Sequence, residues 1–243
     1  MTTHSESEIS RGGGVAREWW LWIVEGPLRD CVTRSSGAAA FLLLALASVS
    51  RGNKILADAG HGIDELAAAR LFATFCQTAF YLGFVWFTLI RGTPVKRAKG
   101  WQPRLSAMIG TFLCLGFGFL PLRSDLPLGW HFLSALLSLF GTGLAAFVVL
   151  PRLGRSFSLV PEARSLVTSG PYRIIRHPLY LVEEMAVFGA FIEVASTAAA
   201  LLLIVQILFQ IRRIYNEETL LCAAFPDYAR YMESSARLIP GVW

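Results

Sequence analysis

Charged residues are scarce in this sequence. Asp, Glu, Lys and Arg together make up 16% of the chain, whereas hydrophobic residues make up 54% and the mean hydropathy is +0.52. A soluble domain usually carries about a quarter charged residues, so the composition argues against a soluble protein and predicts a membrane protein. The net charge of +5 comes without the basic, aromatic-interleaved stripe that is typical of nucleic-acid binding. We interpret this charge as an asymmetry between two membrane faces.

Cysteine is scarce too, and its spacing argues against a metal site. Cys31, Cys76, Cys114 and Cys222 are scattered, with no C-x-x-C pair and no Cys/His spacing, so we interpret them as small buried residues. The sequence also lacks a Walker A loop, G-x-G-x-x-G, H-E-x-x-H and a serine nucleophile elbow. Neither an internal repeat nor a cleavable signal peptide is evident.

Long uncharged runs are present and predict an all-α fold, a polytopic membrane helical bundle with five to six transmembrane helices. The clearest run is Leu71 to Ile90, whose 20 uncharged residues are long enough to cross a bilayer. Ser35 to Ser50 is marginal at 16 residues. The predicted spans are 35–50, 71–90, 105–120, 129–150, 179–192 and 194–211, the last two forming a hairpin around Glu193.

The sequence divides into three predicted regions. Residues 1–34 contain a polar start, predicted to be disordered over 1–18, and a Trp-rich interfacial segment at Trp19 to Val24. Residues 35–150 contain the first four spans. Residues 151–243 contain a polar loop, the helical hairpin and a charged, amphipathic tail that continues the last span.

Basic residues concentrate in alternate connections. With a cytoplasmic N-terminus and six spans, all but four of the 22 Lys and Arg residues fall on the cytoplasmic side, and the exceptions are Arg51, Lys54, Arg70 and Arg123. The positive-inside rule therefore predicts that the loop after residue 150 and the tail share the cytoplasmic face. Soluble cofactors are available there.

The most unusual segment is Arg164 to Tyr180, which reads RSLVTSGPYRIIRHPLY. It is a basic loop between apolar runs, and its Gly-Pro and His-Pro pairs mark turns because the residue before proline is pushed out of helical geometry. Such a loop cannot face lipid, where its backbone groups would be unpaired. We expect it at a membrane face or in a protein-lined cavity.

Charged residues near the hairpin are candidates for chemistry. Arg213 and Glu217 lie four apart on the predicted last helix and share one of its faces, either as part of a site or as solvated juxtamembrane charges. Glu183 and Glu184 begin the fifth span. Intramembrane carboxylates are costly and indicate function, although the nearby loop also allows simple solvation.

Motifs between residues 156 and 240 resemble the isoprenylcysteine carboxyl methyltransferase family, integral-membrane methyltransferases related to phospholipid methyltransferases. The combination of LVTSG-x-Y and RHP-x-Y is specific, and the tail follows two apolar helices in the family's order. The matching residues are Ser156-Phe157-Ser158, LVTSGPY at 166–172, RHPLY at 176–180, Arg213, Glu217-Glu218, Phe225, Tyr228, Tyr231 and Pro240.

The resemblance implies that S-adenosylmethionine is the cofactor, held by the loop and the last helix. It also implies that Arg213 binds the substrate and is catalytic together with Glu218. Pro171, the Glu183-Glu184 pair and Phe225-Pro226 depart from the family pattern and leave the substrate open. The implied cofactor-binding residues are Glu162, Arg164, Ser165, Leu166, Val167, Tyr172, His177, Pro178, Leu179, Tyr180 and Glu217.

Methyl transfer from a sulfonium mainly needs alignment and a dry site. A carboxylate acceptor, with a pKa of about 4, needs no general base and could be held by Arg213. An amine acceptor would need a proton removed, and Glu218 is the candidate base. The predicted function is S-adenosylmethionine-dependent methyl transfer to a lipophilic or lipid-linked carboxylate. N- or S-methylation, a sterol-type membrane reductase and a non-enzymatic membrane protein are the alternatives.

The expected location is an integral, multi-pass membrane protein with its site on the cytosolic face. It would lie in the inner membrane of a bacterium or in the endoplasmic reticulum of a eukaryote. Its expected partners are a lipophilic substrate and membrane lipids, without nucleic acid or metal.

Overall fold

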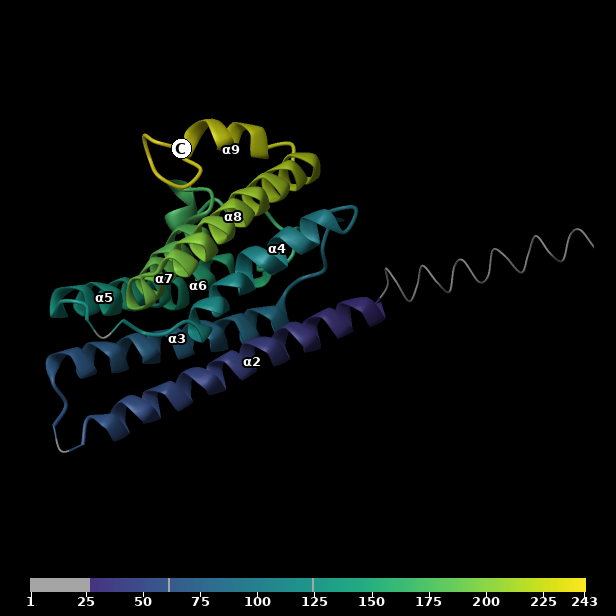
Figure 1. The fold of residues 1–243 in the computed structure, drawn as a ribbon. Helices are drawn as coiled ribbons and strands as arrows, with labels where there is room; N and C mark the ends of the chain where they lie inside the picture. The colour runs from purple at the N-terminus through teal and green to yellow at the C-terminus, as the bar shows by residue number, and fades with distance from the viewer. Residues whose placement is uncertain (1–26, 61, 124) are drawn as a thin grey trace, which may run out of the picture.

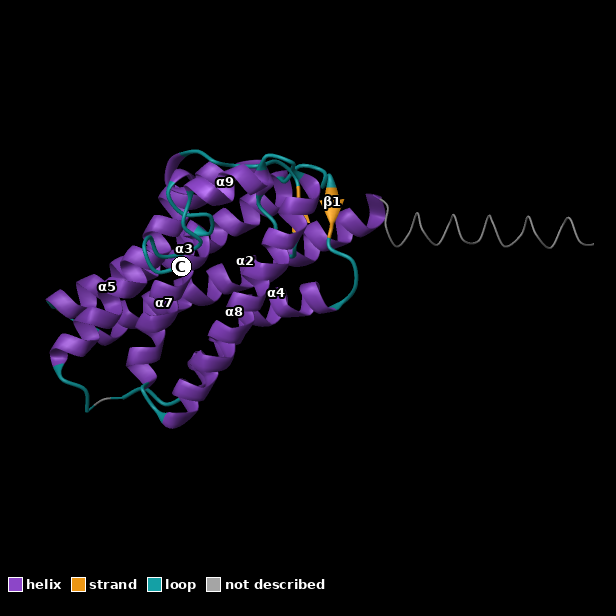
Figure 2. Ribbon diagram, turned by 90° about the horizontal axis from the view of Figure 1, so that it is seen from above, coloured by secondary structure: helices purple, strands orange, loops and turns teal. Residues whose placement is uncertain are grey.

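A computed structural model describes residues 27–243 except 61 and 124. The predictions of disorder over 1–18 and of an interfacial anchor at 19–24 fall outside these residues. Long helices pack side by side, with the C-terminal helix α9 lying across one end of the bundle (Figures 1 and 2). The elements are α2 (Pro27–Asp58), α3 (Glu65–Ile90), β1 (Lys96–Arg97), α4 (Gln102–Phe112), η1 (Leu113–Phe119), α5 (Leu128–Leu144), η2 (Ala145–Val149), α6 (Leu150–Leu153), η3 (Gly154–Ser156), β2 (Glu162–Ala163), η4 (Gly170–Arg173), α7 (Pro178–Val194), α8 (Thr197–Ala224) and α9 (Tyr228–Ser234).

The predicted all-α membrane bundle is confirmed. Within the described residues, four helical segments are long and apolar enough to cross a membrane: Asp30–Asp58, Glu65–Ile90, Leu128–Ser156 and Thr197–Ala224. The other two predicted spans are also helical but shorter. α7 has 17 residues, and the run predicted over 105–120 divides into the 11-residue α4 and the 3-10 segment η1.

The first helix is longer than predicted. The expected span 35–50 is the middle of α2, which has 32 residues, and the supposed polar connection from Arg51 to Arg70 is mostly helical. Charged residues do not end a helix when they project from the bundle end. α3 begins early because Asp64 caps it, accepting a hydrogen bond from the Ala67 amide at 2.6 Å.

Small residues let α5 and α7 approach closely, which fixes the helix that carries the site. A Cβ on Gly141 would lie 2.6 Å from the Val182 carbonyl oxygen, and one on Gly189 would lie 2.6 Å from Ser138 Oγ. Ser134 Oγ also donates to the Gly189 carbonyl at 2.9 Å. Close backbone approach between small residues is the usual way in which helices associate in a membrane.

A π-turn joins α5 to α6. Pro151 lacks a backbone amide and its ring crowds the carbonyl four residues earlier, so the wider turn of η2 absorbs the misfit. The helix then ends at Gly154, whose φ of +51° is a conformation that favours glycine. The chain thereby leaves the bundle and enters the loop that contains the predicted site.

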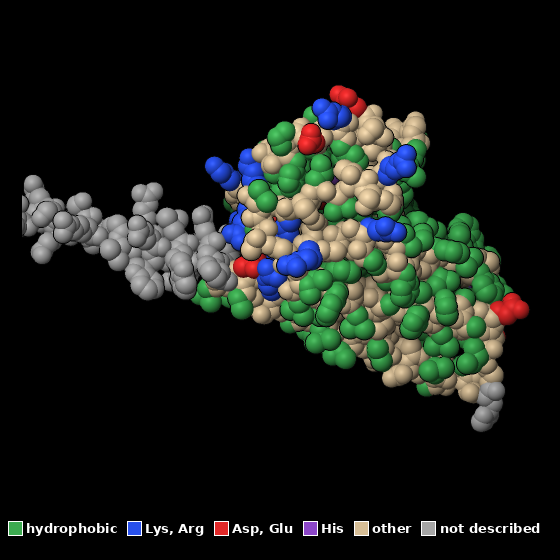
Figure 3. Space-filling model, turned by 180° about the vertical axis from the view of Figure 1, so that it is seen from behind, with side chains coloured by type: hydrophobic (Ala, Val, Ile, Leu, Met, Phe, Trp, Pro, Cys, Tyr) green, Lys and Arg blue, Asp and Glu red, His purple; other side chains and the backbone are tan. Residues whose placement is uncertain are grey.

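Basic side chains gather at one end of the bundle, whereas apolar side chains cover its flank (Figure 3). Three contacts bring the predicted basic connections together at that end: Arg34 Nη1 to the Arg91 carbonyl at 2.7 Å, the pairing of β1 with β2, and Lys96 Nζ to the Ala223 carbonyl at 2.8 Å. At the other end, the amide of Arg123 donates to the Glu193 carbonyl at 2.8 Å. The chain therefore crosses the bundle in the alternating order that the sequence predicts.

Candidate functional site

The candidate site lies where the 151–177 connection meets the first turn of α7 and the end of α8. Pro178 starts α7 at a position where its missing amide costs no helical hydrogen bond. Gly170 takes a φ of +63° at the start of η4, which turns the chain so that Tyr172 is buried. We call the cavity between these elements the inner pocket. It is lined by Leu153, Ser156, Ser158, Glu162, Tyr172, Arg176, His177, Leu179, Tyr180, Arg213 and Glu217.

The inner pocket brings together seven of the residues predicted from the sequence. His177 and Glu217, which are 40 positions apart in the chain, both line it. The other five are Glu162, Tyr172, Leu179, Tyr180 and Arg213. Leu153, Ser156, Ser158 and Arg176 also line the pocket but were not predicted as site residues. Three of these four were already visible in the motifs, as the Ser-x-Ser pair and the arginine of RHP.

Tyr180 contacts three other residues that line the inner pocket. Its hydroxyl donates a hydrogen bond to the Glu217 carboxylate. The His177 ring stacks on the Tyr180 ring at a centroid distance of 5.3 Å and an interplanar angle of 4°. The Arg213 guanidinium lies over the same ring, 4.5 Å from its centroid, in the geometry of a cation–π contact. One side chain therefore aligns a carboxylate, an imidazole and a guanidinium.

Arg213 is 3% exposed and already holds protein partners. Its Nη1 donates to Thr111 Oγ1 at 2.9 Å, and its Nη2 donates to the Leu159 carbonyl at 3.2 Å. The Glu183 carboxylate lies 3.9 Å from Nη1. The guanidinium is thus fixed in position between the inner pocket and the polar residues of α7.

Glu218 does not line the inner pocket, although it was predicted to be catalytic. Its Oε1 accepts from Arg176 Nε at 2.8 Å and lies 3.3 Å from His177 Nε2. Its Oε2 accepts from Arg237 Nε at 2.9 Å. With both oxygens engaged by cationic or hydrogen-bonding side chains, Glu218 joins the loop and the C-terminal segment to α8. Its predicted catalytic role stays a prediction.

The C-terminal segment is fastened to the loop by this contact and by others. The Arg237 guanidinium lies over the rings of both Tyr215 and Trp243, 4.8 and 4.9 Å from their centroids. The Arg176 amide donates to the Ala236 carbonyl at 2.8 Å. Tyr231 donates its hydroxyl to the Tyr172 carbonyl. The wall of the inner pocket thus depends on residues far beyond α8.

Glu162 and Arg164 form an ion pair at the pocket edge. Arg164 Nη2 donates to Glu162 Oε2 at 2.6 Å, and Arg97 Nε lies 3.3 Å from Glu162 Oε1. Burial lowers the pKa of Arg164, and the Glu162 carboxylate opposes that shift. Arg164 itself is buried and does not line the inner pocket; its Nε donates to the Gly92 carbonyl at 2.8 Å.

The remaining predicted cofactor residues lie around the inner pocket but not on its surface. Ser165 hydrogen-bonds through its hydroxyl to Ser156, which does line the pocket. Val167 packs against the central apolar cluster, and Pro178 is buried at the start of α7. Leu166 faces a different cavity. The loop 164–167 therefore supports the pocket wall instead of lining it.

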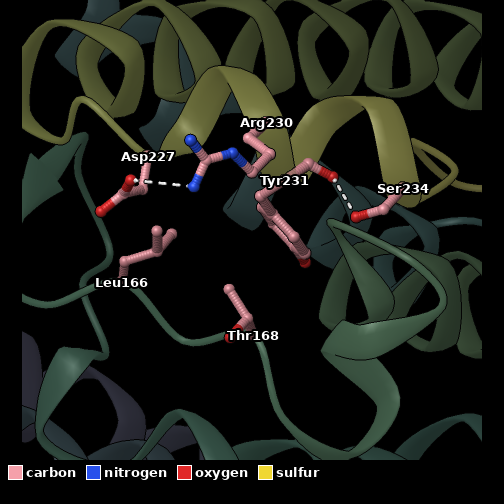
Figure 4. A pocket seen from close by; sticks show the side chains of 6 residues that line it. All are labelled: Leu166, Thr168, Asp227, Arg230, Tyr231 and Ser234. Carbon is pink, nitrogen blue, oxygen red and sulfur yellow. Dashed lines mark hydrogen bonds and ion pairs between the residues drawn. The ribbon is translucent and has the colours of Figure 1, made fainter.

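That second cavity, the outer cavity, has a volume of about 430 Å³ and lies between the loop and α9 (Figure 4). It is lined by Leu166, Thr168, Asp227, Arg230, Tyr231 and Ser234. The inner pocket is much smaller, at about 50 Å³. Sites for drug-sized ligands have volumes of about 300–1,000 Å³, so the inner pocket as it stands is closed down around its own side chains.

Burial also sets the state of Tyr172. Its removal from water, with the carboxylate of Glu217 nearby, raises the pKa of its phenol well above the ordinary value. Tyr172 is thus a neutral aromatic surface on the pocket wall at any physiological pH.

Comparison with known proteins agrees with the motif evidence. Residues 135–223, which extend from within α5 almost to the end of α8, match the model of the Isoprenylcysteine carboxyl methyltransferase (ICMT) family. The resemblance predicted from the loop is thereby confirmed, and this part of the chain is ICMT-like. The family implies a membrane-associated methyltransferase activity.

The chain is also similar to the Cobalt-zinc-cadmium resistance protein CzcN of Cupriavidus metallidurans, with 35% identity over 78 residues. The matched segment covers 31% of this chain and 36% of that protein. The chain thus spans about a third of the length of this curated relative. No solved structure matches the chain.

Proposed function

We propose that this ICMT-like membrane protein transfers a methyl group from S-adenosylmethionine to a lipophilic or lipid-linked acceptor, most directly to a carboxylate, at the cytosolic membrane face. The observation that carries the proposal is the meeting of Tyr180, Arg213 and Glu217 in one pocket. The loop motif and the end of α8 contribute to it jointly, as the resemblance requires.

The chemistry of the inner pocket suits the two ends of S-adenosylmethionine. Glu217 offers a carboxylate to its cationic groups and Tyr172 offers an aromatic face, whereas Glu162 and Arg176 are held by protein partners and would have to exchange them for the cofactor. When bound, the cofactor supplies a methyl group on a sulfonium leaving group. Because the pocket holds only about 50 Å³, binding requires the loop to move outward from α8.

The acceptor would be held by Arg213. A carboxylate takes two parallel hydrogen bonds from a guanidinium fork and needs no general base at neutral pH. This agrees with the engagement of Glu218 elsewhere, since no free base is required of it. Arg213 would align the acceptor oxygen, and Tyr180 would hold the orientation of the guanidinium.

The acceptor tail would lie in the bilayer. The inner pocket is at the basic end of the bundle, and apolar side chains cover the flank beside it (Figure 3). By the positive-inside rule this end faces the cytosol, where the cofactor is available. In a bacterium the membrane would be the inner one, and in a eukaryote the endoplasmic reticulum.

Calorimetric titration with S-adenosylhomocysteine tests cofactor binding directly. The full chain would be purified in lipid nanodiscs, and its helical circular dichroism would establish folding. We expect saturable 1:1 binding that S-adenosylmethionine displaces. A folded protein that binds neither compound would refute the proposed function.

The type of methyl transfer can be read from the product. The protein would be incubated with methyl-labelled S-adenosylmethionine and S-farnesylcysteine, and the lipid extract would be treated with mild alkali. A methyl ester releases labelled methanol under alkali, whereas N-methyl and S-methyl products retain the label. We expect the wild-type protein to give volatile label. Alkali-stable label would indicate N- or S-methylation instead of O-methylation.

A further inference from the structure

Polar side chains continue from Arg213 into the membrane part of the bundle. Gln210 and Gln206 lie three and seven positions before Arg213, on the same face of α8. Glu183 and Glu184 face them from α7: Gln210 Nε2 donates to Glu183 Oε2 at 3.3 Å and Gln206 Nε2 donates to Glu184 Oε1 at 2.8 Å. We call these four residues the polar recess.

The polar recess has too few hydrogen-bond donors for its acceptors. Gln206 and Gln210 are 1% and 3% exposed, and their amide nitrogens already donate to the two carboxylates. Gln206 Nε2 also lies 3.3 Å from the Gly110 carbonyl. Among the residues that the structure describes, the buried atoms Glu184 Oε2, Gln206 Oε1 and Gln210 Oε1 have no hydrogen-bond partner. A buried acceptor without a donor is costly, so these atoms indicate a missing donor.

A packing contact accounts for one of the three atoms. Gln210 Oε1 lies against Gly110, where a Cβ would be 3.2 Å from it, so a weak Cα–H contact is its neighbour. Glu184 Oε2 and Gln206 Oε1 are buried and have no hydrogen-bond partner in the described chain. Both come from residues that also bond each other, so one incoming donor group could serve both.

The surroundings of Arg213 also indicate a group that can donate hydrogen bonds. Two carboxylates, Glu183 and Glu184, lie near a single guanidinium, that of Arg213, whose Nη1 and Nη2 already donate to Thr111 and Leu159. An ammonium can donate hydrogen bonds to both carboxyl and amide oxygens, whereas a carboxylate can donate none. About 15% of the Glu183 side chain is still accessible, so a group next to Arg213 can reach it.

We propose that the polar recess binds an amino group carried by the head of the methyl acceptor, beside the group that receives the methyl. This inference rests on the proposed function and narrows its substrate to amphiphiles with an amino-acid-like head. The acceptor carboxylate lies at Arg213, and the ammonium donates to Glu184, Gln206 and Glu183. The Glu183-Glu184 pair, which departs from the family pattern, is thus a determinant of substrate specificity.

Three matched amphiphiles test the inference by binding alone. S-Farnesylcysteine carries a carboxylate and an ammonium, N-acetyl-S-farnesylcysteine carries the carboxylate with a neutral amide, and S-farnesyl-3-mercaptopropionic acid carries only the carboxylate. Affinities would be measured on the full chain in nanodiscs saturated with S-adenosylhomocysteine. We expect the first to bind at least about tenfold more tightly than the other two, which corresponds to about 1.4 kcal/mol.

Charge-neutral variants test whether the polar recess causes the preference for the amphiphile with an ammonium group. Glu184→Gln and Glu183→Gln keep the side-chain shape, and each should reduce the preference to about threefold or less while leaving the affinity for S-adenosylhomocysteine unchanged. The matched control is Glu193→Gln, the same change at the other end of α7, where the partners are Arg70 and His131. It should leave the preference intact.

Three results would overturn the inference: equal affinity for the three amphiphiles, a preference that survives both recess variants, or no binding of any amphiphile. Equal affinity would mean that protonated carboxyl groups satisfy the recess on their own. The wild-type comparison stands even if a variant fails to fold. Binding of S-adenosylhomocysteine without the preference would refute this inference alone, whereas failure to bind S-adenosylhomocysteine would refute the proposed function as well.

Discussion

Tyr180 donates its hydroxyl to the carboxylate of Glu217 across a sequence separation of 37 residues. This contact joins the first turn of α7 to the last turns of α8 and places the loop motif against the end of the bundle. Both residues line the inner pocket, together with His177. A cofactor held between the loop and α8 would therefore meet a wall whose parts are already bonded to one another.

Removing the hydroxyl tests this contact. Tyr180→Phe keeps the ring that stacks on His177 and lies under Arg213, but it leaves Glu217 without its donor. Hydrogen bonds to charged groups contribute about 1.5–3 kcal/mol, so we expect S-adenosylhomocysteine to bind roughly tenfold to a hundredfold more weakly. Calorimetry on the nanodisc-embedded protein measures the change.

The matched control is Tyr81→Phe, which removes a hydroxyl that accepts from Gln77 on α3, outside the inner pocket. Its affinity for S-adenosylhomocysteine should equal that of the wild type. Equal affinities in Tyr180→Phe and Tyr81→Phe would show that the Tyr180 hydroxyl does not support cofactor binding.

Arg213 is expected to matter for turnover more than for cofactor binding. Arg213→Lys keeps the charge beside Glu183 but loses the planar fork and the fit over Tyr180. We expect kcat to fall by about a hundredfold, with the dissociation constant of S-adenosylhomocysteine within about threefold of wild type. Arg212→Lys, the same change at the adjacent exposed position, is the control. A loss of cofactor binding equal to the loss of turnover would assign Arg213 to the cofactor instead.

Neutralising Glu218 should lower the stability of the protein, whereas neutralising its neighbour Glu217 should weaken cofactor binding. Glu218→Gln leaves Arg176 and Arg237 without their carboxylate, and breaking a buried ion pair costs about 3 kcal/mol or more. We expect a lower melting temperature, faster proteolysis of the C-terminal segment and a raised KM. Glu217→Gln should weaken cofactor binding with little change in stability.

Melting temperature, cofactor affinity and turnover together distinguish a structural role of Glu218 from a catalytic one. If Glu218→Gln melts like the wild type and binds S-adenosylhomocysteine normally but turns over far more slowly, Glu218 acts on the substrate. Such a result would restore the base that the sequence suggested and would favour an amine as the methyl-accepting group.

Hydropathy and motif predicted different parts of this molecule. Uncharged runs located α3, α5 and α8, because a helix in lipid must be apolar along its whole length. They misplaced the ends of α2, since charges at a bundle end project outward without ending the helix. The run over 105–120 was divided because η1 is glycine-rich, and Gly116 lies so close to Leu202 that a Cβ would be 2.9 Å from its Cδ2.

The loop motif predicted which segments meet, but only some of the side chains that face the pocket. Leu166 lies on the outer cavity and Ser165 lies behind Ser156, because the direction of each loop side chain depends on turns that the sequence does not specify. The partners of Glu218 come from positions 19 and 42 residues away. Ion pairs at such separations follow from the folded path and could not be read from local spacing.

Helix packing behind the site gives a prediction about stability. Gly141→Ala would place a Cβ 2.6 Å from the Val182 carbonyl, on the helix that carries Tyr180. Overpacking of this kind costs about 1–3 kcal/mol, and we expect a lower melting temperature with weaker binding of S-adenosylhomocysteine. The control is Gly129→Ala, which lies on α5 like Gly141 but has nothing within 4 Å of the new Cβ. It should be neutral or slightly stabilising. Equal melting temperatures would mean that α5 and α7 can separate without affecting the site.

The charge distribution predicts the orientation in the membrane, and labelling can test this prediction. Asp227 and Asp125 are exposed residues at opposite ends of the bundle, beside the outer cavity and beside Glu193 respectively. In a background with Cys31 and Cys222 changed to Ser, Asp227→Cys should react with an impermeant maleimide only from the cytosolic side. Asp125→Cys should react only from the opposite side. The reverse pattern would place the inner pocket away from cytosolic S-adenosylmethionine, and a cytosolic methyl donor could then not serve this site.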